Sequence, residues 1–354
     1  MKGKKKKIVA LFSTLMIALS ITAACSDDSS TAAGQSNGDS SNAGEAKNLI
    51  LTTQTVGTAV YSRAAAFNEI INTVLPEGYS MEVQPSSTGG AATILLLEAN
   101  KAQIGTSNNV PAKKLFEGTY DENRPPVENV ASIMGGTDFT YMTIMFTDSF
   151  VKKTGIKTFE EIIEKKYPVR VVTKQAGSFG ITGAEDLLDT MDVNFEDIKS
   201  WGGDVFHIDP SQMVDMLKEG KADISIDVVS LGQPAFSELT MTTTMHVIEL
   251  SQETRDKLND YGYANKVIPA KSWGGQDNDI QTVVGTESLV VRKDVPDEVV
   301  YAIIKALSEN KSKLVELVPV MKDFDPENAG NLEYLGIPLH PGAEKYFKEV
   351  GYLQ

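Results

Sequence analysis

The 354-residue chain has one cysteine and three histidines. A single cysteine excludes an internal disulfide, a CxxC redox pair and a cluster of thiolate metal ligands. His207, His246 and His340 lie far apart and form no pair with metal-ligand spacing. The sequence therefore predicts neither a metal site nor a bound cofactor.

Basic residues are scarce after the N-terminus. Without the five lysines of the first seven residues, 28 basic residues face 48 acidic ones, a formal net charge of −20. Such a surface repels nucleic acid and anionic lipid, so neither is an expected partner of the body. The acidity is typical of a soluble domain displayed in solvent.

The longest apolar run, residues 8–21, is too short for an ordinary membrane-spanning helix. It follows the lysines and precedes Ala23, Ala24 and Cys25, a pattern typical of an export signal that ends in a lipid-modifiable cysteine. We predict a lipoprotein signal peptide over residues 1–24 and a protein anchored to the cell membrane, outside the cytoplasm, through acylated Cys25. Cleavage elsewhere, with Cys25 unmodified, stays open.

The segment after Cys25 is rich in Ser, Gly, Asn, Ala and Asp and has no aromatic residue up to position 47. This composition cannot bury a core and behaves as a flexible tether. We therefore assign residues 25–47 to the lipidated cysteine and its tether, and expect the globular body to begin near Asn48.

The body opens with alternating strand and helix patterns. Strands are predicted over 49–53 and 81–84, a helix over 91–99, and another helix between the two strands. The apolar face of that intervening helix contains Phe67, Ile70, Ile71, Val74 and Leu75. A βαβαβ start predicts an α/β protein whose parallel sheet has helices on its faces.

An internal similarity favours two related lobes. Residues 97–104 (LEANKAQI) reappear as residues 217–224 (LKEGKADI). In each copy an amphipathic helix ends at a residue that tolerates a left-handed backbone, Asn100 or Gly220, and a strand is expected two residues later. A chance match of a common helix-to-strand turn stays open.

Polar turns precede three predicted helices, at residues 52–58, 86–90 and 175–183. Each turn places backbone N–H groups and small hydroxyls at a helix N-terminus, which suits a carboxylate. Ligands of open α/β sheets bind at these strand ends. Ordinary helix capping explains any one turn, but three together favour a ligand cleft.

Four segments carry a family resemblance: residues 57–61, the Thr-Gly-Gly turn at 88–90 with the LLLEANKAQIG stretch, GSFGITGAEDLL at 177–188, and LHPGAEKYFKEVG at 339–351. With them, the body resembles the TAXI-type solute receptors of TRAP (tripartite ATP-independent periplasmic) transporters. The resemblance implies a two-lobed, type II-like periplasmic-binding-protein fold. It further implies a receptor, not an enzyme, that binds a small organic acid or glutamate-like amino acid between its lobes and delivers it to a TRAP permease.

The resemblance also assigns the ligand-binding residues, which belong to the polar turns and to the strand end after the second turn. These are Gln54, Thr55, Thr58, Tyr61, Ser87, Thr88, Gly89, Asn108, Ser178, Phe179, Gly180 and Thr182. Their hydroxyls, amides and N–H groups are expected to bind carboxylates without an arginine.

We predict that residues 48–137 and 284–354 form lobe 1 and that residues 138–283 form lobe 2. Asp227, at the end of a strand predicted over 222–226, faces either the cleft or solvent. An ionised carboxylate in the cleft would repel an anionic solute unless paired, or would favour a solute that carries an amino group.

Three other functions stay open. A lipoprotein receptor of an ABC importer shares the fold and the anchor. An exported hydrolase would need a base within hydrogen-bond reach of Ser178. A module that binds a protein partner would need an exposed apolar patch and no closed cleft.

Overall fold

The structure, a computed structural model, describes residues 47–121 and 123–353. The predicted signal peptide, Cys25 and the tether up to residue 46 lie outside the described residues. Lys47, predicted to end the tether, is the first residue of a strand.

Within the described residues, ten strands form one mixed sheet. They are β1 (Lys47–Thr52), β2 (Tyr79–Gln84), β3 (Ile104–Asn108), β4 (Val130–Thr147), β5 (Arg170–Thr173), β6 (Asp204–His207), β7 (Ile224–Ser230), β8 (Met245–Ile248), β9 (Ala264–Ile268) and β10 (Ile280–Arg292).

Helices connect the strands and cover the faces of the sheet. They are α1 (Ala59–Ile71), α2 (Gly90–Glu98), α3 (Asn109–Glu117), α4 (Asp148–Thr154), α5 (Phe159–Glu164), α6 (Phe179–Asp189), α7 (Phe195–Ser200), α8 (Pro210–Lys218), α9 (Pro234–Thr242), α10 (Gln252–Asp260), α11 (Asp297–Glu309), α12 (Lys311–Leu317), the 3-10 helix η1 (Pro319–Asp323), α13 (Leu332–Leu335) and α14 (Pro341–Glu349).

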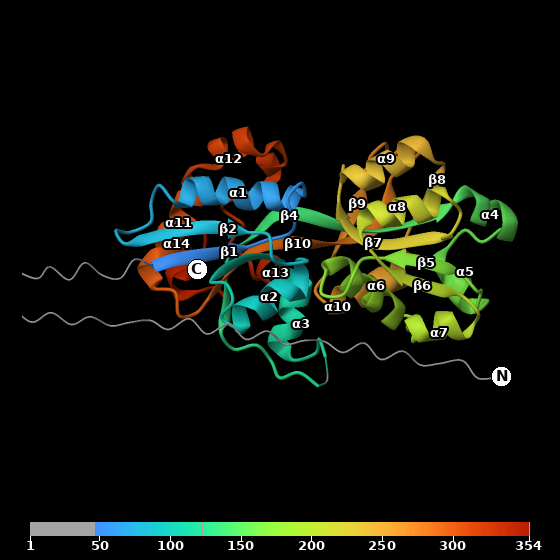
Figure 1. Cartoon of the computed structure of the whole chain (residues 1–354), viewed down its shortest axis with the longest axis horizontal. Helices are drawn as coiled ribbons and strands as arrows, with labels where there is room; N and C mark the ends of the chain where they lie inside the picture. The colour runs from blue at the N-terminus through green and yellow to red at the C-terminus, as the bar shows by residue number, and fades with distance from the viewer. Residues whose placement is uncertain (1–46, 122, 354) are drawn as a thin grey trace, which may run out of the picture. The chain divides into compact units, whose positions relative to one another are not determined.

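Two long strands connect the halves of the sheet. The order is β2-β1-β3-β10-β4-β7-β5-β6, with β8 beside β4 and β9 beside β10. Strands β4 and β10 run from the group of α1–α3 and α11–α14 to the group of α4–α10 (Figure 1). We call the first group, with β1–β3, lobe 1 and the second, with β5–β9, lobe 2. The predicted lobe boundaries fall inside β4 and β10, where both strands are continuous, and stay a prediction.

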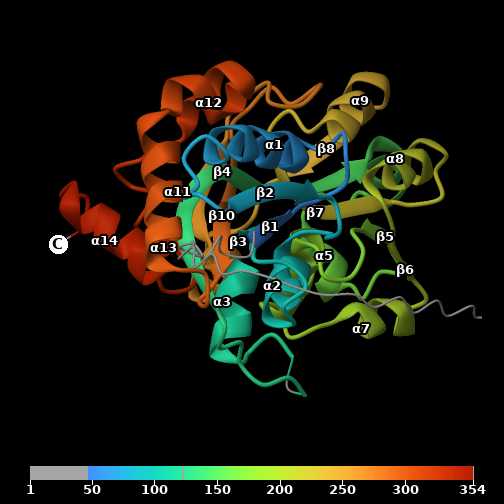
Figure 2. The same cartoon turned by 60° about the vertical axis from the view of Figure 1, so that its left-hand side comes forward.

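Lobe 1 is a sheet between two helical layers, because its central strands alternate their side chains. On β10, Leu289 and Val291 belong to the core with α1, α11 and α14, while Val290 belongs to the core with α2 and α3. Figure 2 shows α1, α11 and α12 on one side of β1 and β2, and α2 and α3 on the other.

Lobe 2 repeats this arrangement with its own two cores. On β5, Val171 packs with the core that contains Leu187 of α6, while Val172 packs with the core that contains Phe236 of α9. The mixed α/β architecture predicted from the sequence is confirmed. The sheet is not purely parallel, because β4 and β10 pair antiparallel with each other and with β7 and β3.

Several predicted boundaries need correction. Helix α6 begins at Phe179, although the sequence suggested a turn through residue 183, because Ser178 caps the helix five residues earlier than predicted. Asp227 is in the middle of β7, not at a strand end. In the internal similarity, Asn100 and Gly220 do adopt left-handed backbones, with φ of 53° and 67°. Their strands begin at Ile104 and Ile224, two residues later than predicted.

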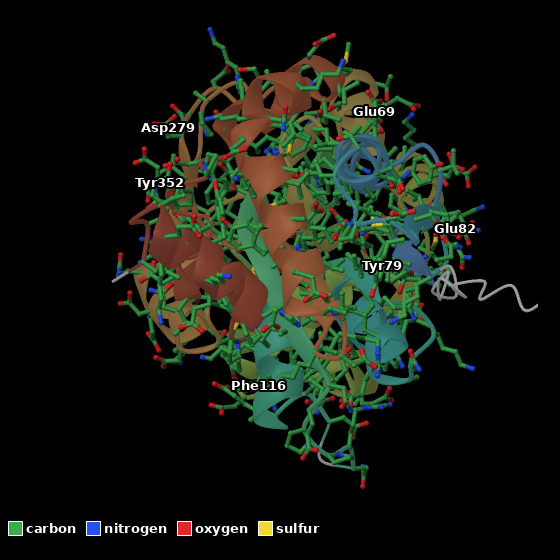
Figure 3. All side chains as sticks on the ribbon, turned by 90° about the vertical axis from the view of Figure 1, so that its left-hand side faces the viewer. Glu69, Tyr79, Glu82, Phe116, Asp279 and Tyr352 are labelled. Carbon is green, nitrogen blue, oxygen red and sulfur yellow. The ribbon has the colours of Figure 1, made fainter. Side chains whose placement is uncertain are left out.

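Acidic side chains populate the surface. Glu69, Glu82 and Asp279 are exposed and extend outward at the periphery (Figure 3). Within residues 47–121 and 123–353, every helix is too short or too polar to cross a bilayer.

The packing of the lobe 1 core predicts that Phe67 contributes strongly to stability. Phe67 of α1 is fully buried, whereas Val56 is 69% exposed. Phe67→Ala should lower the free energy of unfolding by about 3–5 kcal/mol, because it removes a buried ring and leaves a cavity. Val56→Ala should change it by less than about 0.5 kcal/mol. Urea unfolding measures both, and equal losses would contradict the assignment of Phe67 to the core.

Candidate ligand-binding cavity

A cavity of about 630 Å³ lies between the lobes, within the size range of small-molecule sites. Its wall includes residues from both lobes and from the two crossing strands. Nine predicted site residues line it: Gln54, Thr55, Thr58, Ser87, Thr88, Asn108, Ser178, Phe179 and Gly180.

The other three predicted residues are near the cavity but not in its wall. Tyr61 is half-buried on α1, and its backbone N–H donates to Thr58 Oγ1 at 3.1 Å. Gly89 is the N-cap of α2 and adopts φ of 89°. Thr182 is buried in α6, where its hydroxyl donates to the Ser178 carbonyl. Their predicted roles in binding stay predictions.

The hydroxyls at two helix starts perform capping. Thr58 Oγ1 accepts from Tyr61 N and donates to the Thr55 carbonyl at 2.8 Å. Ser178 Oγ accepts from Ile181 N at 3.3 Å and donates to the Gln175 carbonyl at 2.7 Å. Each hydroxyl therefore uses its proton within its own turn and offers a ligand only a remaining lone pair.

The turn before α2 is similarly occupied. Ser87 Oγ accepts from Gly89 N at 2.9 Å and is paired with Thr93 Oγ1 at 2.7 Å. Thr88 is exposed, and its hydroxyl makes only a long 3.4 Å bond to the Ala176 carbonyl. Asn108, at the end of β3, is buried, and its amide makes a 3.5 Å bond to the Thr286 carbonyl. Thr88 and Asn108 thus keep most of their hydrogen-bonding capacity.

Helix N-termini converge on the cavity from both lobes. The first residues of α1, α6, α8 and α9 line it, and Ser87 and Thr88 immediately precede α2. The first N–H groups of a helix lack intrahelical partners and carry the positive end of the helix dipole. The dipoles of these helices thus direct positive potential toward the cavity.

The lobes touch directly beside the cavity. Ala92 N donates to the Gly177 carbonyl at 3.1 Å, joining α2 to the turn before α6. Lys114 of α3 forms an ion pair with Asp186 of α6, and Asn109 Nδ2 donates to the Gly262 carbonyl at 3.1 Å. These contacts hold the two walls of the cavity together.

The cavity wall contains an arginine that the sequence analysis missed. Arg63 of α1 is 1% exposed; its Nε and Nη2 donate to Glu287 at 2.8 and 2.6 Å, and its Nη1 is 3.0 Å from Asp138 Oδ2. Burial raises the pKa of Asp138, as does the nearby Glu287 charge, while Arg63 opposes this rise. Arg63 occupies a helix position typical of a core residue, and its partners are distant in sequence.

A second missed group is Lys174, directly after β5. Its Nζ is 3.0 Å from Asp227 Oδ1, and Asp227 is fully buried behind the cavity wall. The structure thus answers the question that the sequence left open: Asp227 faces neither solvent nor the open cleft but is paired with a lysine. Burial raises the pKa of Asp227, and Lys174 opposes this rise. The sequence did contain a signal for Lys174: the residue follows a strand and precedes a helix, which is where ligands of open α/β sheets bind.

A known protein family matches most of this chain. The model of the NMT1-like family matches residues 51–351. The chain belongs to the NMT1-like family. The more specific TAXI-type assignment stays a prediction.

A solved structure, that of MatC, shows the same fold. MatC (Rpa3494) from Rhodopseudomonas palustris, solved with bound malate, is 11% identical with a TM-score of 0.52, covering 86% of this chain and 96% of MatC. The periplasmic binding protein BugD is 14% identical with a TM-score of 0.49, covering 85% and 94%. The fold of this chain is the two-lobed α/β fold of periplasmic binding proteins.

Two further features bear on other kinds of chemistry: the surroundings of Ser178, which a hydrolase would use as its nucleophile, and the distribution of potential metal ligands. Among the described residues, the hydrogen-bond partners of the Ser178 hydroxyl are backbone groups. No cluster of three or more potential metal ligands occurs within residues 47–121 and 123–353.

A substitution of Gly90 tests the contact between α2 and the turn before α6. It adopts φ of 51°, and a Cβ there would lie 2.8 Å from Phe179 N. Gly90→Ala should push α2 away from the turn before α6 and increase hydrogen exchange at Ala92. Gly78→Ala is the control, because Gly78 has a similar φ of 85° but open space around it. Mass spectrometry measures the exchange, and equal effects of the two variants would show that strain alone is responsible.

The raised pKa of Asp138 predicts that the stability of the folded protein depends on pH. Because its folded pKa is raised above the usual value of 3.8, its contribution favours folding below that pH and is lost as the pH rises through the folded pKa. Asp138→Asn removes this loss, so the stability of the variant relative to wild type should increase as the pH rises above about 4. Unfolding titrations across pH measure this, with Asp277→Asn in an exposed loop as control. A constant difference would contradict the prediction.

Proposed function

We propose that this protein is an extracytoplasmic solute receptor that binds a small organic acid or amino acid through a carboxylate. The observation that carries the proposal is the cavity between the lobes, lined by helix N-termini from both of them. A cavity shared by two lobes allows closure around a solute, as in two-lobed binding proteins generally. No covalent step is part of the proposal.

The carboxylate preference rests on the helix N-termini and on the polar side chains that keep free capacity. Backbone N–H groups at helix starts bind anions without a compensating cation. Thr88 and Asn108 can add hydrogen bonds, since their present bonds are 3.4 and 3.5 Å long. The malate bound to MatC is consistent with this class of solute.

Anchoring and delivery complete the proposal. The predicted acylation of Cys25 would keep the receptor at the membrane, with a second acyl chain for firm attachment. The resemblance to TAXI-type receptors favours a TRAP permease as the partner. An ABC importer is the alternative, and transport assays with each permease type would separate the two.

A ligand screen tests the proposal. The full-length protein in mild detergent is melted with glutamine, glutamate, glutarate, 2-oxobutyrate, succinate, malate and glucose. A solute that binds the folded state stabilises it by about 2.7 kcal/mol at a hundredfold excess over its Kd. We expect at least one carboxylate, but not glucose, to raise the melting temperature.

The control is a matched pair of threonine variants. Thr88→Ala should reduce the shift, whereas Thr119→Ala, which removes a similar exposed 3.4 Å bond to a backbone carbonyl, should not. Mass analysis of small molecules released on denaturation detects a solute that is already bound. No released carboxylate and no shift would overturn the proposed function.

A further inference from the structure

Two basic residues line the cavity in the described part of the chain, Arg63 and Lys174. A carboxylate in the cavity would be attracted by either side chain, provided that the carboxylates paired with it do not outnumber it. Their surroundings therefore decide which one can hold the solute and what net charge the solute carries.

Arg63 is more than compensated. Its guanidinium is placed between two carboxylates, Glu287 and Asp138, with three contacts of 2.6–3.0 Å. Both carboxylates also line the cavity. With both ionised, the cluster presents a net negative charge to the solute, so a carboxylate placed there would be repelled in a medium of low dielectric constant.

Lys174 has the opposite arrangement. Its ammonium has three N–H donors, of which one is directed to Asp227 Oδ1 at 3.0 Å and one to the Val228 carbonyl at 3.4 Å. The Lys174 side chain lines the cavity and is 21% exposed, while Asp227 is 0% exposed and outside the wall. Lys174 is therefore the member of this ion pair that lines the cavity.

The surrounding backbone makes room for the pair. Gly180, in the first turn of α6, has no side chain, and a Cβ there would overlap Asp227 Oδ1 and lie 2.8 Å from Lys174 Cδ. The lysine stem thus crosses the N-terminus of α6, where the helix N–H groups add to its positive potential. Asp227 Oδ2 has no hydrogen-bond partner among the described residues, so Lys174 is its main compensation.

We propose that Lys174, held by buried Asp227, is the specificity-determining cation of the cavity and binds the single carboxylate of the solute. Because the Arg63 cluster bears surplus negative charge when Asp138 and Glu287 are both ionised, the rest of the solute is neutral or carries an amino group, and a second carboxylate is disfavoured. This inference rests on the proposed function and narrows its solute class to monocarboxylates and zwitterions.

The test compares solutes of matched chain length and variants of the pair. In full-length wild-type protein, glutamine should bind more tightly than glutarate, and 2-oxobutyrate more tightly than succinate. Lys174→Met removes the ammonium but leaves Asp227 uncompensated, so it can also destabilise the fold. Lys174→Met combined with Asp227→Asn removes both charges and should melt near the wild-type temperature. It should nevertheless weaken monocarboxylate binding about 10- to 100-fold, the value of a hydrogen bond to a charged group.

The control removes a comparable pair away from the cavity. Lys165 and Glu161 form an exposed ion pair at 2.5 Å, so Lys165→Met with Glu161→Gln should leave affinity unchanged. Wild-type affinity in the Lys174/Asp227 double variant, or tighter binding of the dicarboxylates, would overturn the inference while the proposed function survives. If no carboxylate binds or is released from wild type, the proposed function fails and this inference fails with it.

Discussion

The pairing of β4 with β10 is the constraint on which the rest of the structure depends. The two strands pair from Tyr141 and Val284 in lobe 2 to Val130 and Arg292 in lobe 1. Strand β10 lies between β3 and β4 in lobe 1, and β4 lies between β10 and β7 in the sheet order, so neither strand can slip without losing many hydrogen bonds. Movement of one lobe against the other is therefore confined to bending of these strands, and the cavity lies where they cross.

The ladder is irregular at the point where the charged wall is built. Its register shifts between Glu287 and Leu289, and Glu287 pairs with Asp138 directly beside this shift. Bulges redirect side chains and bend strands. Here both carboxylates reach Arg63 of α1, which links a lobe 1 helix to both crossing strands. A buried cluster of this kind stabilises little by itself, but removing one member would leave uncompensated charge.

The sequence predicted the features that depend on residues close together in the chain. Periodicity located the α/β alternation, and nine of the twelve predicted site residues line the cavity. It could not pair residues distant in the chain: Arg63 is separated from Glu287 by 224 positions. Asp227 was expected at the end of a strand over 222–226, yet it lies in the middle of β7, where Lys174 compensates its charge. Arrangements of this kind depend on tertiary contacts that no local pattern encodes.

The hydroxyls and the charged groups of the cavity have different roles, because they differ in the hydrogen bonds that they can still form with a ligand. The Thr58 and Ser178 hydroxyls donate to backbone carbonyls, so each can donate to a carboxylate only by giving up its bond to the Thr55 or Gln175 carbonyl. The donors left for the proposed carboxylate include helix N–H groups, the side chains of Thr88 and Asn108, and the ammonium of Lys174. The helix dipoles supply a diffuse positive potential, whereas the lysine supplies a localised charge fixed by Asp227. Helix capping and the proposed anion binding are compatible in the same turns, because the cap hydroxyls satisfy single N–H groups and the helix dipoles keep their positive ends at the cavity.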